Sequence, residues 1–490
     1  MKIVTRALLT IGLLLTILSA CNLPTGSGAG PSTGPAQADG PAVTAQPPAA
    51  PANAAELVQP ADIEYLGAFR LPDGGERPLT FEYGGNAMTF NPDGDPSGSG
   101  DGFPGSLFVT GHDRMPYGDL PDGSQVAEVS IPAPVVSRNV ADLNMAGFVQ
   151  DFSNVTASAF TQRDEIPKIG LLYLNRPETG PLIHIAWGQH LQPPDVPSHG
   201  WFSPTLADAN MTGFWFIGDI DLYSVNGYLF EIPAEWADTY TGGRTIATGR
   251  MRDGGQGGMG PTLLAYTPWL PDGSAPADGT RLAETTLLLY ENAYNTEDIV
   301  RAMNGYQYPD EWEGGAWLTT ASGRTAVLFA GTKSNGTKFW YGYINPDGPQ
   351  YACVDAHVTD FPTCRTADGG ICPQEDFSGC CTEETGGCVS LRGWWSTHLD
   401  AQFILYNPDD LARVAAGEMQ PWEPQPYAVI DIDDHLFLSP PEWDLQNVGW
   451  GDQRRYRIGD TAFDRANGLL YVLELFADGA KPVVHVWSVK

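Results

Sequence analysis

Short runs of apolar residues separated by clusters of turn-forming residues make up the chain from residue 61 to residue 490. The runs are rich in Val, Leu, Phe, Tyr and Trp, whose side chains suit the half-buried surface of a pleated sheet. We predict strands at residues 107–110, 126–131, 170–174, 183–187, 214–217, 228–232, 263–266, 286–290, 326–330, 339–344, 402–406, 469–473 and 483–489. Glycine (57 residues) and proline (41 residues) favour turns over long helices, so the pattern predicts an all-β domain.

Helical spacing of apolar residues is found in two short segments. Residues 409–418 follow Asn407-Pro408, a pair typical of the start of a helix. Residues 296–303 are followed by Asn304-Gly305, which favours a helix end. Both segments are short enough to decorate loops of a β domain.

A loose repeat relates the beginning and the end of the domain. Residues 85–90 (Gly-Asn-Ala-Met-Thr-Phe) lead to strands at 107–109 and 126–132, and residues 459–464 (Gly-Asp-Thr-Ala-Phe-Asp) lead to strands at 469–472 and 483–489. Similar glycine-led starts occur at Gly170, Gly213, Gly258 and Gly315. Several of the spacings between starts are roughly 45 to 57 residues, which is typical of propeller blades.

This arrangement resembles a bacterial β-propeller over residues 61–490. The six starts favour six blades, while five, seven or eight blades remain open, and two separate β-sandwiches are the structural alternative. A propeller must close its ring, because an open edge strand promotes aggregation. We therefore expect residues 63–70 to form a strand beside residues 483–489.

The first 20 residues have the features of an export signal. Lys2 and Arg6 precede an apolar run at residues 7–20 that is too short to span a bilayer comfortably. The run ends in Leu-Ser-Ala-Cys at residues 18–21, which resembles the lipobox of bacterial lipoproteins. The resemblance implies cleavage after residue 20, lipidation of Cys21 and anchoring outside the cytoplasm to the cell membrane or the outer membrane; an ordinary signal peptide is the alternative. Residues 21–60, rich in Gly, Pro and Ala, read as a tether.

The charge of the chain limits its partners. Acidic residues number 59 and basic residues 26, which gives a formal net charge of −33. Nucleic acids and anionic lipid surfaces are bound through Lys and Arg, so the composition argues against both. The expected partners are the membrane, through the lipid anchor, and an extracellular ligand, glycan or protein.

Six of the seven cysteines lie in residues 353–388, a stretch with few large apolar residues. In an exported protein an even set of cysteines indicates disulfides, here three bridges with their pairing left open. A zinc cluster is the alternative, although the stretch has no Cys-x-x-Cys spacing. The predicted disulfide-rich insertion uses Cys353, Cys364, Cys372, Cys380, Cys381 and Cys388.

Residues 93–101 (Asp-Gly-Asp-Pro-Ser-Gly-Ser-Gly-Asp) place oxygen-bearing side chains at alternate positions with glycine at the sixth. This resembles the start of a calcium-binding loop, which implies Ca²⁺ ligands at Asp93, Asp95, Ser97 and Asp101. Pro104 stands where such a loop has its last glutamate, and a polar turn is the alternative. Residues 255–260 match Gly-x-Gly-x-x-Gly, but a proline and a strand follow instead of a helix, so we interpret them as a turn.

Polar residues near strand ends are the candidates for chemistry. In a propeller the loops of every blade meet around one channel mouth, so residues distant in sequence can converge. The candidate catalytic residues are His112, His199, Glu291 and Arg252, each of which could equally be held by ordinary structural hydrogen bonds. Trp394-Trp395 is a candidate platform for stacking sugars.

The sequence contains no nucleophile elbow, no His-Glu-x-x-His and no phosphate-binding P-loop motif. We therefore expect a ligand- or protein-binding module at the cell surface. The alternative is a hydrolase or lyase that acts on a glycan or phosphoester at the channel mouth, assisted by calcium.

Overall fold

The computed structural model describes residues 56–95, 98–100, 102–112, 124–156, 167–189, 196–220, 225, 227–250, 255, 257–292, 299–335, 338–340, 394–396, 398–438, 454 and 457–490. All of them belong to one unit, Pro47–Lys490. Several predicted positions lie outside these residues: the signal segment 1–20, Cys21, Ser97, Asp101, Arg252 and the six cysteines of residues 353–388. Within the described part, no helix is long and apolar enough to cross a membrane.

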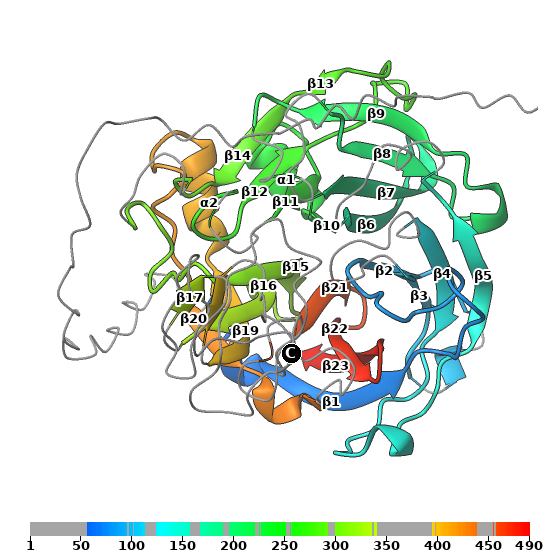
Figure 1. The fold of residues 1–490 in the computed structure, drawn as a ribbon. Coiled ribbons are helices and arrows are strands. Elements are labelled where there is room, and N and C mark those ends of the chain that lie inside the picture. Colours follow the sequence, from blue (N-terminus) through cyan, green and yellow to red (C-terminus); the bar gives the residue numbers. More distant parts are fainter. Residues whose placement is uncertain are drawn as a thin grey trace, which may run out of the picture. The chain divides into compact units, whose positions relative to one another are not determined.

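Five sheets surround a central axis as the blades of a propeller (Figure 1). From the axis outward, the first blade contains β2 (Met88–Asn91), β3 (Ser106–Thr110), β4 (Gln125–Ser130) and β5 (Phe148–Asn154). The second contains β6 (Pro167–Arg176), β7 (Gly180–Gln189), β8 (His199–Phe202) and β9 (Thr212–Ile217), with β13 (Arg281–Leu282) added in parallel outside β9. The third contains β10 (Tyr228–Glu231), β11 (Ile246–Gly249), β12 (Leu263–Tyr266) and β14 (Glu284–Leu288).

The fourth blade contains β15 (Glu311–Thr319), β16 (Thr325–Ser334), β19 (Leu399–Tyr406) and β20 (Ala428–Asp431). The fifth contains β21 (Ile458–Asp464), β22 (Leu469–Asp478), β23 (Lys481–Val489) and, outermost, β1 (Ile63–Arg70). A separate ribbon pairs β17 (Lys338–Trp340) with β18 (Trp394–Ser396). The predicted all-β propeller is therefore confirmed, and two separate sandwiches do not form.

The number of blades differs from the favoured prediction of six. Gly213 lies in β9, the fourth strand of the second blade, and Gly258 lies shortly before β12, the third strand of the third blade. Neither glycine begins a blade. The inner strand of the third blade instead follows Gly227, which the repeat pattern did not mark. A glycine before a strand is a general turn signal, so it does not distinguish an inner strand from an outer one.

Strand β1 closes the ring as predicted. It pairs antiparallel with β23 from Ile63 opposite Val489 to Arg70 opposite Val483. The residues just before this strand are packed as well, because Leu57 and Val58 are buried and the Val58 N–H donates to the Thr325 carbonyl oxygen (3.2 Å). The last residues that we assigned to the tether therefore pack on the fourth blade.

A buried polar network lies behind the closing strand. Glu474 and His485 are both fully buried, and Glu474 Oε2 lies 2.9 Å from His485 Nε2. The other ring nitrogen of His485 lies 2.9 Å from the Tyr65 hydroxyl of β1. Glu474 also accepts backbone N–H bonds from Phe437 (2.9 Å) and Leu438 (2.8 Å). The first and last strands and the segment after β20 are thus joined through one carboxylate.

The core consists of apolar clusters between neighbouring blades. Each of the five pairs of adjacent blades encloses its own cluster of buried side chains, among them Trp312 between the third and fourth blades and Trp487 between the fourth and fifth. Such burial contributes about 25 cal/mol per Å² of apolar surface, and here it acts between sheets rather than within one sheet. Stability therefore depends on every blade having two neighbours.

Glycines allow the inner strands to approach one another near the axis. A Cβ atom on Gly170 would lie 2.0 Å from the Gly227 carbonyl oxygen, and one on Gly459 would lie 2.1 Å from the Gly85 carbonyl oxygen. Side chains then link the strands: the Met88 N–H donates to Asp460 Oδ2 (3.0 Å). We call the end of the ring where the inner strands finish the carboxyl rim, and the opposite end the amino rim.

Helices in the described residues are short. Helix α2 (Pro408–Ala415) confirms the first predicted helix, and its N-cap Asn407 accepts the Asp409 N–H through Oδ1 (3.0 Å). The prediction of a helix at residues 296–303 is wrong over its described part, 299–303, where Arg301 has a positive φ of 51°. Helix α1 (Ala234–Tyr240), between β10 and β11, was not predicted.

Candidate functional site

A pocket of about 310 Å³ opens at the carboxyl rim, at the mouth of the central channel. All five inner strands or the turns that follow them contribute to its wall. Five of the lining residues, one from each blade, are Phe90, Arg176, Glu231, Trp317 and Arg465. We call this the channel-mouth pocket.

Two arginines flank one carboxylate in the pocket wall. Arg176 Nη2 lies 3.2 Å from Glu231 Oε1, and Arg465 Nη2 lies 3.8 Å from Glu231 Oε2. Neither contact has hydrogen-bond geometry, since the Arg176 Nη2 and Nε atoms are buried without a hydrogen bond and the second distance is too long. In the described contacts, charge rather than a hydrogen bond therefore holds the Glu231 carboxylate beside the two guanidinium groups.

Arg465 is fixed more firmly than Arg176. Its Nη1 donates to the Trp317 carbonyl oxygen (3.2 Å) and to Thr319 Oγ1 (2.7 Å), and its Nη2 donates to the Glu231 carbonyl oxygen (3.3 Å). Burial lowers the pKa of the Arg465 guanidinium, although Glu231 opposes this effect, and the group stays charged at neutral pH. Arg465 therefore fastens the third, fourth and fifth blades together.

The local sequence explains how Arg465 reaches this position. It lies in the tight turn between β21 and β22, where Asp464 Oδ1 accepts the N–H groups of Ala466 (3.0 Å) and Asn467 (3.2 Å). The Asn467 side-chain amide also donates to Asp464 (2.6 Å). Such side-chain-to-backbone bonds stabilise turns, so Asp464 holds the turn that presents Arg465 to the pocket.

Aromatic side chains form the apolar part of the wall. Phe230 and Trp317 are buried, whereas Phe90 and Phe463 are half-buried. The Arg465 guanidinium carbon lies 5.9 Å from the centre of the Phe463 ring. The pocket therefore combines partly accessible aromatic surface with charged hydrogen-bonding groups.

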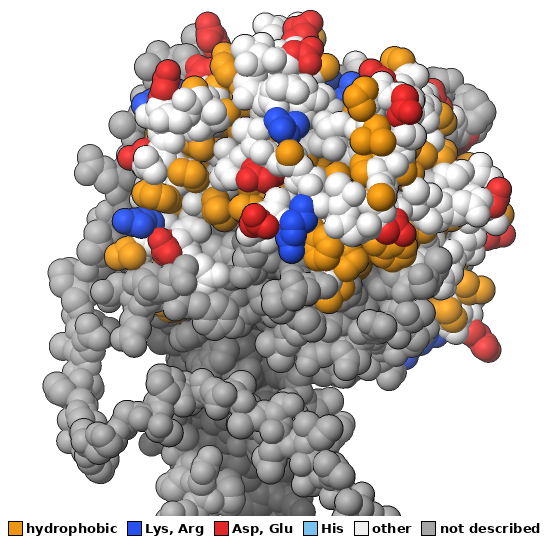
Figure 2. All heavy atoms as spheres, turned by 90° about the horizontal axis from the view of Figure 1, so that it is seen from above, with side chains coloured by type: hydrophobic (Ala, Val, Ile, Leu, Met, Phe, Trp, Pro, Cys, Tyr) orange, Lys and Arg blue, Asp and Glu red, His pale blue; other side chains and the backbone are white. Residues whose placement is uncertain are grey.

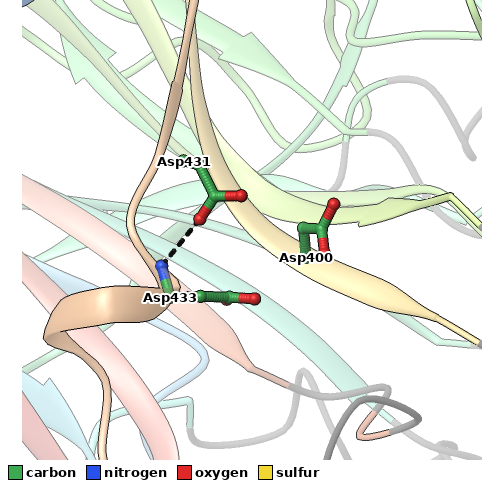
Figure 3. Close-up of side chains that lie close together, drawn as sticks. All are labelled: Asp400, Asp431 and Asp433. Atoms are coloured by element: carbon green, nitrogen blue, oxygen red, sulfur yellow. Dashed lines mark hydrogen bonds between the residues drawn. The ribbon is translucent and has the colours of Figure 1, made fainter.

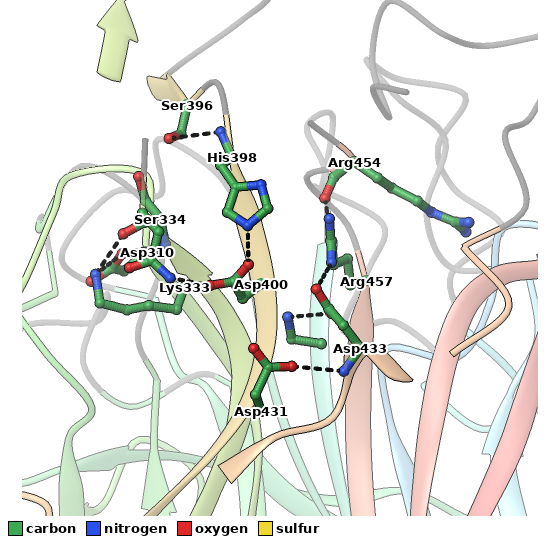
Figure 4. A network of polar contacts seen from close by, with 12 residues as sticks. Asp310, Lys333, Ser334, Ser396, His398, Asp400, Asp431, Asp433, Arg454 and Arg457 are labelled. Atoms are coloured by element: carbon green, nitrogen blue, oxygen red, sulfur yellow. Dashed lines mark hydrogen bonds and ion pairs between the residues drawn. The ribbon is translucent and has the colours of Figure 1, made fainter. Parts of the chain in front are cut away.

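A second polar cluster lies in the fourth blade, near the start of β19 and the end of β20. Carboxylate oxygens of Asp400, Asp431 and Asp433 lie within 4.8 Å of one another (Figure 3). His398 Nε2 lies 2.6 Å from Asp400 Oδ1, and Asn335 donates to the other oxygen of Asp400. We call these residues the carboxylate network (Figure 4).

Basic groups partner two of the three carboxylates. Arg457 is fully buried, and its Nη1 lies 2.5 Å from Asp433 Oδ2. Burial raises the pKa of Asp433, while Arg457 and the Ala401 N–H lower it in part. Nearby, Lys333 Nζ lies 3.0 Å from the buried Asp310 Oδ1 (Figure 4). Asp433 thus has an arginine and Asp400 a histidine as its basic neighbour within the protein.

The structure places the predicted catalytic residues apart. His112 follows β3 in the first blade, where its Nδ1 lies 3.0 Å from the Glu82 carbonyl oxygen. His199, in β8, is fully buried with Ser198 Oγ at 2.8 Å and Thr248 Oγ1 at 2.9 Å from its two ring nitrogens. It links the second and third blades, as a structural histidine does.

Glu291 follows β14 beyond the third blade, and its Oε2 lies 3.4 Å from Arg301 Nη1. None of the described contacts of His112, His199 or Glu291 joins one of these residues to another. Arg252 lies outside the described residues. Catalysis by these residues stays a prediction.

The predicted calcium loop is described in part. Asp93 Oδ2 accepts hydrogen bonds from the Tyr173 hydroxyl (3.1 Å) and from Asn175 Nδ2 (3.3 Å). The Asp95 carbonyl oxygen accepts the Gly98 N–H (3.3 Å). Asp93 thus links the first and second blades, and calcium ligation by this loop stays a prediction.

Sequence comparison adds no family assignment. No protein-family model matches the chain, and no curated protein matches it. Arg176, Glu231 and Arg465 were not among the predicted site residues, although Arg176 and Glu231 lie at or next to the ends of the predicted strands 170–174 and 228–232, and Arg465 follows the repeat segment 459–464.

The charged side chains on the face shown in Figure 2 do not gather into one patch. Figure 2 shows acidic side chains at several separate places on one face, with basic and hydrophobic side chains between them. The excess of acid is thus spread over this face. A pocket with walls from five blades is a more specific feature.

Proposed function

We propose that the chain is a lipid-anchored, extracytoplasmic binding protein whose propeller holds a sugar residue of a glycan in the channel-mouth pocket. The observation that carries this proposal is the convergence of all five blades on one pocket of about 310 Å³. Pockets of a few hundred Å³ hold small molecules. Anchoring through Cys21 rests on the lipobox resemblance.

The chemistry of the wall favours a sugar. Half-buried Phe90 and Phe463 offer aromatic faces to the apolar side of a sugar ring. Asn175, Arg176 and Glu231 offer donors and acceptors that match hydroxyl groups. Binding is the better-supported function, since the described contacts bring no pair of the predicted catalytic residues together.

Blocking the pocket is expected to abolish sugar binding. Ala466 is exposed and lines the pocket, and its side chain makes none of the turn bonds, so Ala466→Trp fills space without disturbing Asp464. Because the indole would occupy the space of the ligand, we expect at least a tenfold rise in Kd, about 1.4 kcal/mol. The measurement is titration calorimetry of residues 56–490 with a panel of monosaccharides and oligosaccharides.

The matched control is Ala416→Trp, which adds the same side chain at an exposed position just after α2. It should bind every sugar as the wild type does. If no sugar binds the wild type, or if both tryptophan variants bind equally well, the channel-mouth pocket is not a sugar site.

A hydrolase acting on a glycan or phosphoester is the second candidate, and one observation favours it. The His398 side chain is 45% exposed beside the Asp400 side chain, which is 8% exposed. A buried carboxylate that orients an accessible imidazole is a common arrangement for general acid–base catalysis. Asp431 and Asp433 lie next to this pair.

Under this second proposal, His398→Ala should lower the hydrolysis of chromogenic glycosides or phosphodiesters by at least about 100-fold, the usual contribution of a general acid or base. His435→Ala is the control, because His435 is also half-buried but stacks on Tyr65 outside the carboxylate network. Wild-type protein without activity on either substrate class, or equal activity of both variants, would eliminate the hydrolase reading.

A further inference from the structure

We propose that the sugar in the channel-mouth pocket is an acidic one, whose carboxylate binds the Nε/Nη2 edge of Arg176 by displacing the side chain of Glu231. This inference rests on the proposed function and names the ligand class more narrowly. It follows from the contacts of Arg176, Glu231 and Arg465 in the pocket wall, where two guanidinium groups lie beside one carboxylate without a hydrogen bond to it.

Arg176 has the donors that such a ligand needs. Its Nε and Nη2 atoms are both buried and neither makes a hydrogen bond. These two atoms form one edge of the planar guanidinium, the edge that can bind both oxygens of a carboxylate at once. Buried donors without acceptors are unfavourable, so this edge gains from an oxygen ligand.

Glu231 covers that edge without satisfying it. Its carboxylate lies 3.2 Å from Arg176 Nη2 and 3.8 Å from Arg465 Nη2, and neither contact is a hydrogen bond. The Glu231 side chain is 35% exposed, so it has room to move toward solvent. It acts as an internal counter-ion that an external carboxylate can replace.

The second arginine explains why the exchange is electrostatically possible in an acidic protein. The chain has only 26 basic residues against 59 acidic ones, yet two of the basic residues lie in this wall. Arg465 is held by three hydrogen bonds to the fourth and third blades and stays in place when Glu231 moves. After displacement, two guanidinium groups face the carboxylate of the ligand.

The rest of the pocket fits the body of a hexuronate. The volume of about 310 Å³ suits a single sugar ring with its substituents. Phe90 and Phe463 lie half-buried in the wall, where a ring can pack against them. A neutral hexose has the same ring but no carboxylate for the Arg176 edge, so the two sugars separate the contribution of the ring from that of the charge.

The test measures the affinities of D-glucuronate, D-galacturonate, glucose and galactose by titration calorimetry. It uses residues 56–490 with the wild-type sequence and with the substitutions named below. We expect the wild type to bind each hexuronate at least tenfold more tightly than its hexose. Arg176→Met should remove this preference, because it should weaken hexuronate binding far more than hexose binding. Glu231→Gln should tighten hexuronate binding severalfold, because the internal competitor loses its charge.

The controls are Arg413→Met and Glu235→Gln, which make the same charge changes at exposed positions of α2 and α1. Neither should change the preference.

Equal affinity of the wild type for hexose and hexuronate would overturn this inference but not the proposal that the pocket binds a sugar. The inference is also overturned if Glu231→Gln weakens hexuronate binding as much as Arg176→Met does. Glu231 would then contact the ligand directly and would not compete with it. If the wild type binds no sugar, or if Ala466→Trp does not abolish the sugar binding that is observed, both proposals are overturned.

Discussion

A chain that lacks β1 is expected not to form a stable propeller. Truncation to residues 73–490 leaves the outer edge of β23 unpaired and removes Ala68, Phe69 and Leu71, all of which are 0% exposed. Loss of one buried phenylalanine side chain alone costs about 3–5 kcal/mol, and a typical domain is stable by only about 5–15 kcal/mol. Far-UV circular dichroism and urea unfolding should show no cooperative transition, whereas residues 56–490 should give one.

A circular permutant distinguishes loss of the strand from a general effect of truncation. The Lys490 N–H donates to the Asp62 carbonyl oxygen (2.9 Å), so the end of β23 lies beside the start of β1. A chain that begins at residue 73 and carries residues 56–71 after a flexible linker at Lys490 keeps every pairing of β1. We expect it to unfold cooperatively, with a midpoint close to that of residues 56–490. A stable truncated chain, or a permutant that remains unfolded, would contradict closure by this strand.

Apolar periodicity was sufficient to predict the ring because the same pattern is repeated locally in each blade. The prediction for residues 263–266 matches β12 and that for residues 63–70 matches β1, and the closing pair also follows from the need to protect an edge. The blade number did not follow, because glycines precede outer strands as well as inner ones. Gly213 lies in an outer strand, β9, whereas Gly227 precedes an inner strand, β10.

The sequence could not reveal the channel-mouth pocket, because the pattern along the chain does not show which strands are the inner ones. Arg176, Glu231 and Arg465 are far apart in the chain: Arg176 and Glu231 are the last residues of β6 and β10, and Arg465 follows β21. Only the order of the strands within the sheets brings these ends to the same rim. A search restricted to the ends of inner strands would have found them, but that search requires the blade boundaries first.

His199 was predicted as a catalytic residue, but the structure buries it between two blades. A histidine at a strand end is a reasonable catalytic candidate, yet this strand is the third of its blade and its side chain enters the space before the next blade. There it contacts Thr248 of β11 and packs edge-on against the Tyr266 ring (5.2 Å between ring centres). Neighbouring blades bury residues that a single sheet would leave at its surface.

The same space between the second and third blades makes acid instability a strong expectation. His184 and His199 are both fully buried, and burial lowers the pKa of each to about 3, with a further lowering of the His184 pKa by Arg176. In the unfolded chain both titrate near 6.5. Between pH 6.5 and pH 3 the unfolded state therefore binds more protons than the folded state, and stability falls as the pH falls.

The expected loss is large. Each group contributes about 1.4 kcal/mol per pH unit within this window, so at pH 4.5 the two histidines together lower the free energy of unfolding by about 5 kcal/mol. Asp460 acts in the opposite direction, because burial raises the pKa of its carboxyl well above the usual value and its protonated form favours the folded state in acid. The net slope is thus smaller than the histidine contribution, and a histidine variant is needed to isolate that contribution.

His184→Leu is the informative change, since neither ring nitrogen of His184 has a hydrogen-bond partner and the ring packs against Trp201 and Trp269. The leucine keeps the apolar contacts and removes one titrating group, so the variant should be at least as stable as the wild type at pH 7 and should lose about 2–3 kcal/mol less between pH 6.5 and pH 4.5. Urea unfolding at half-unit pH steps measures both quantities. Equal pH slopes for the two proteins would mean that His184 is already protonated, or already exposed, in the folded state.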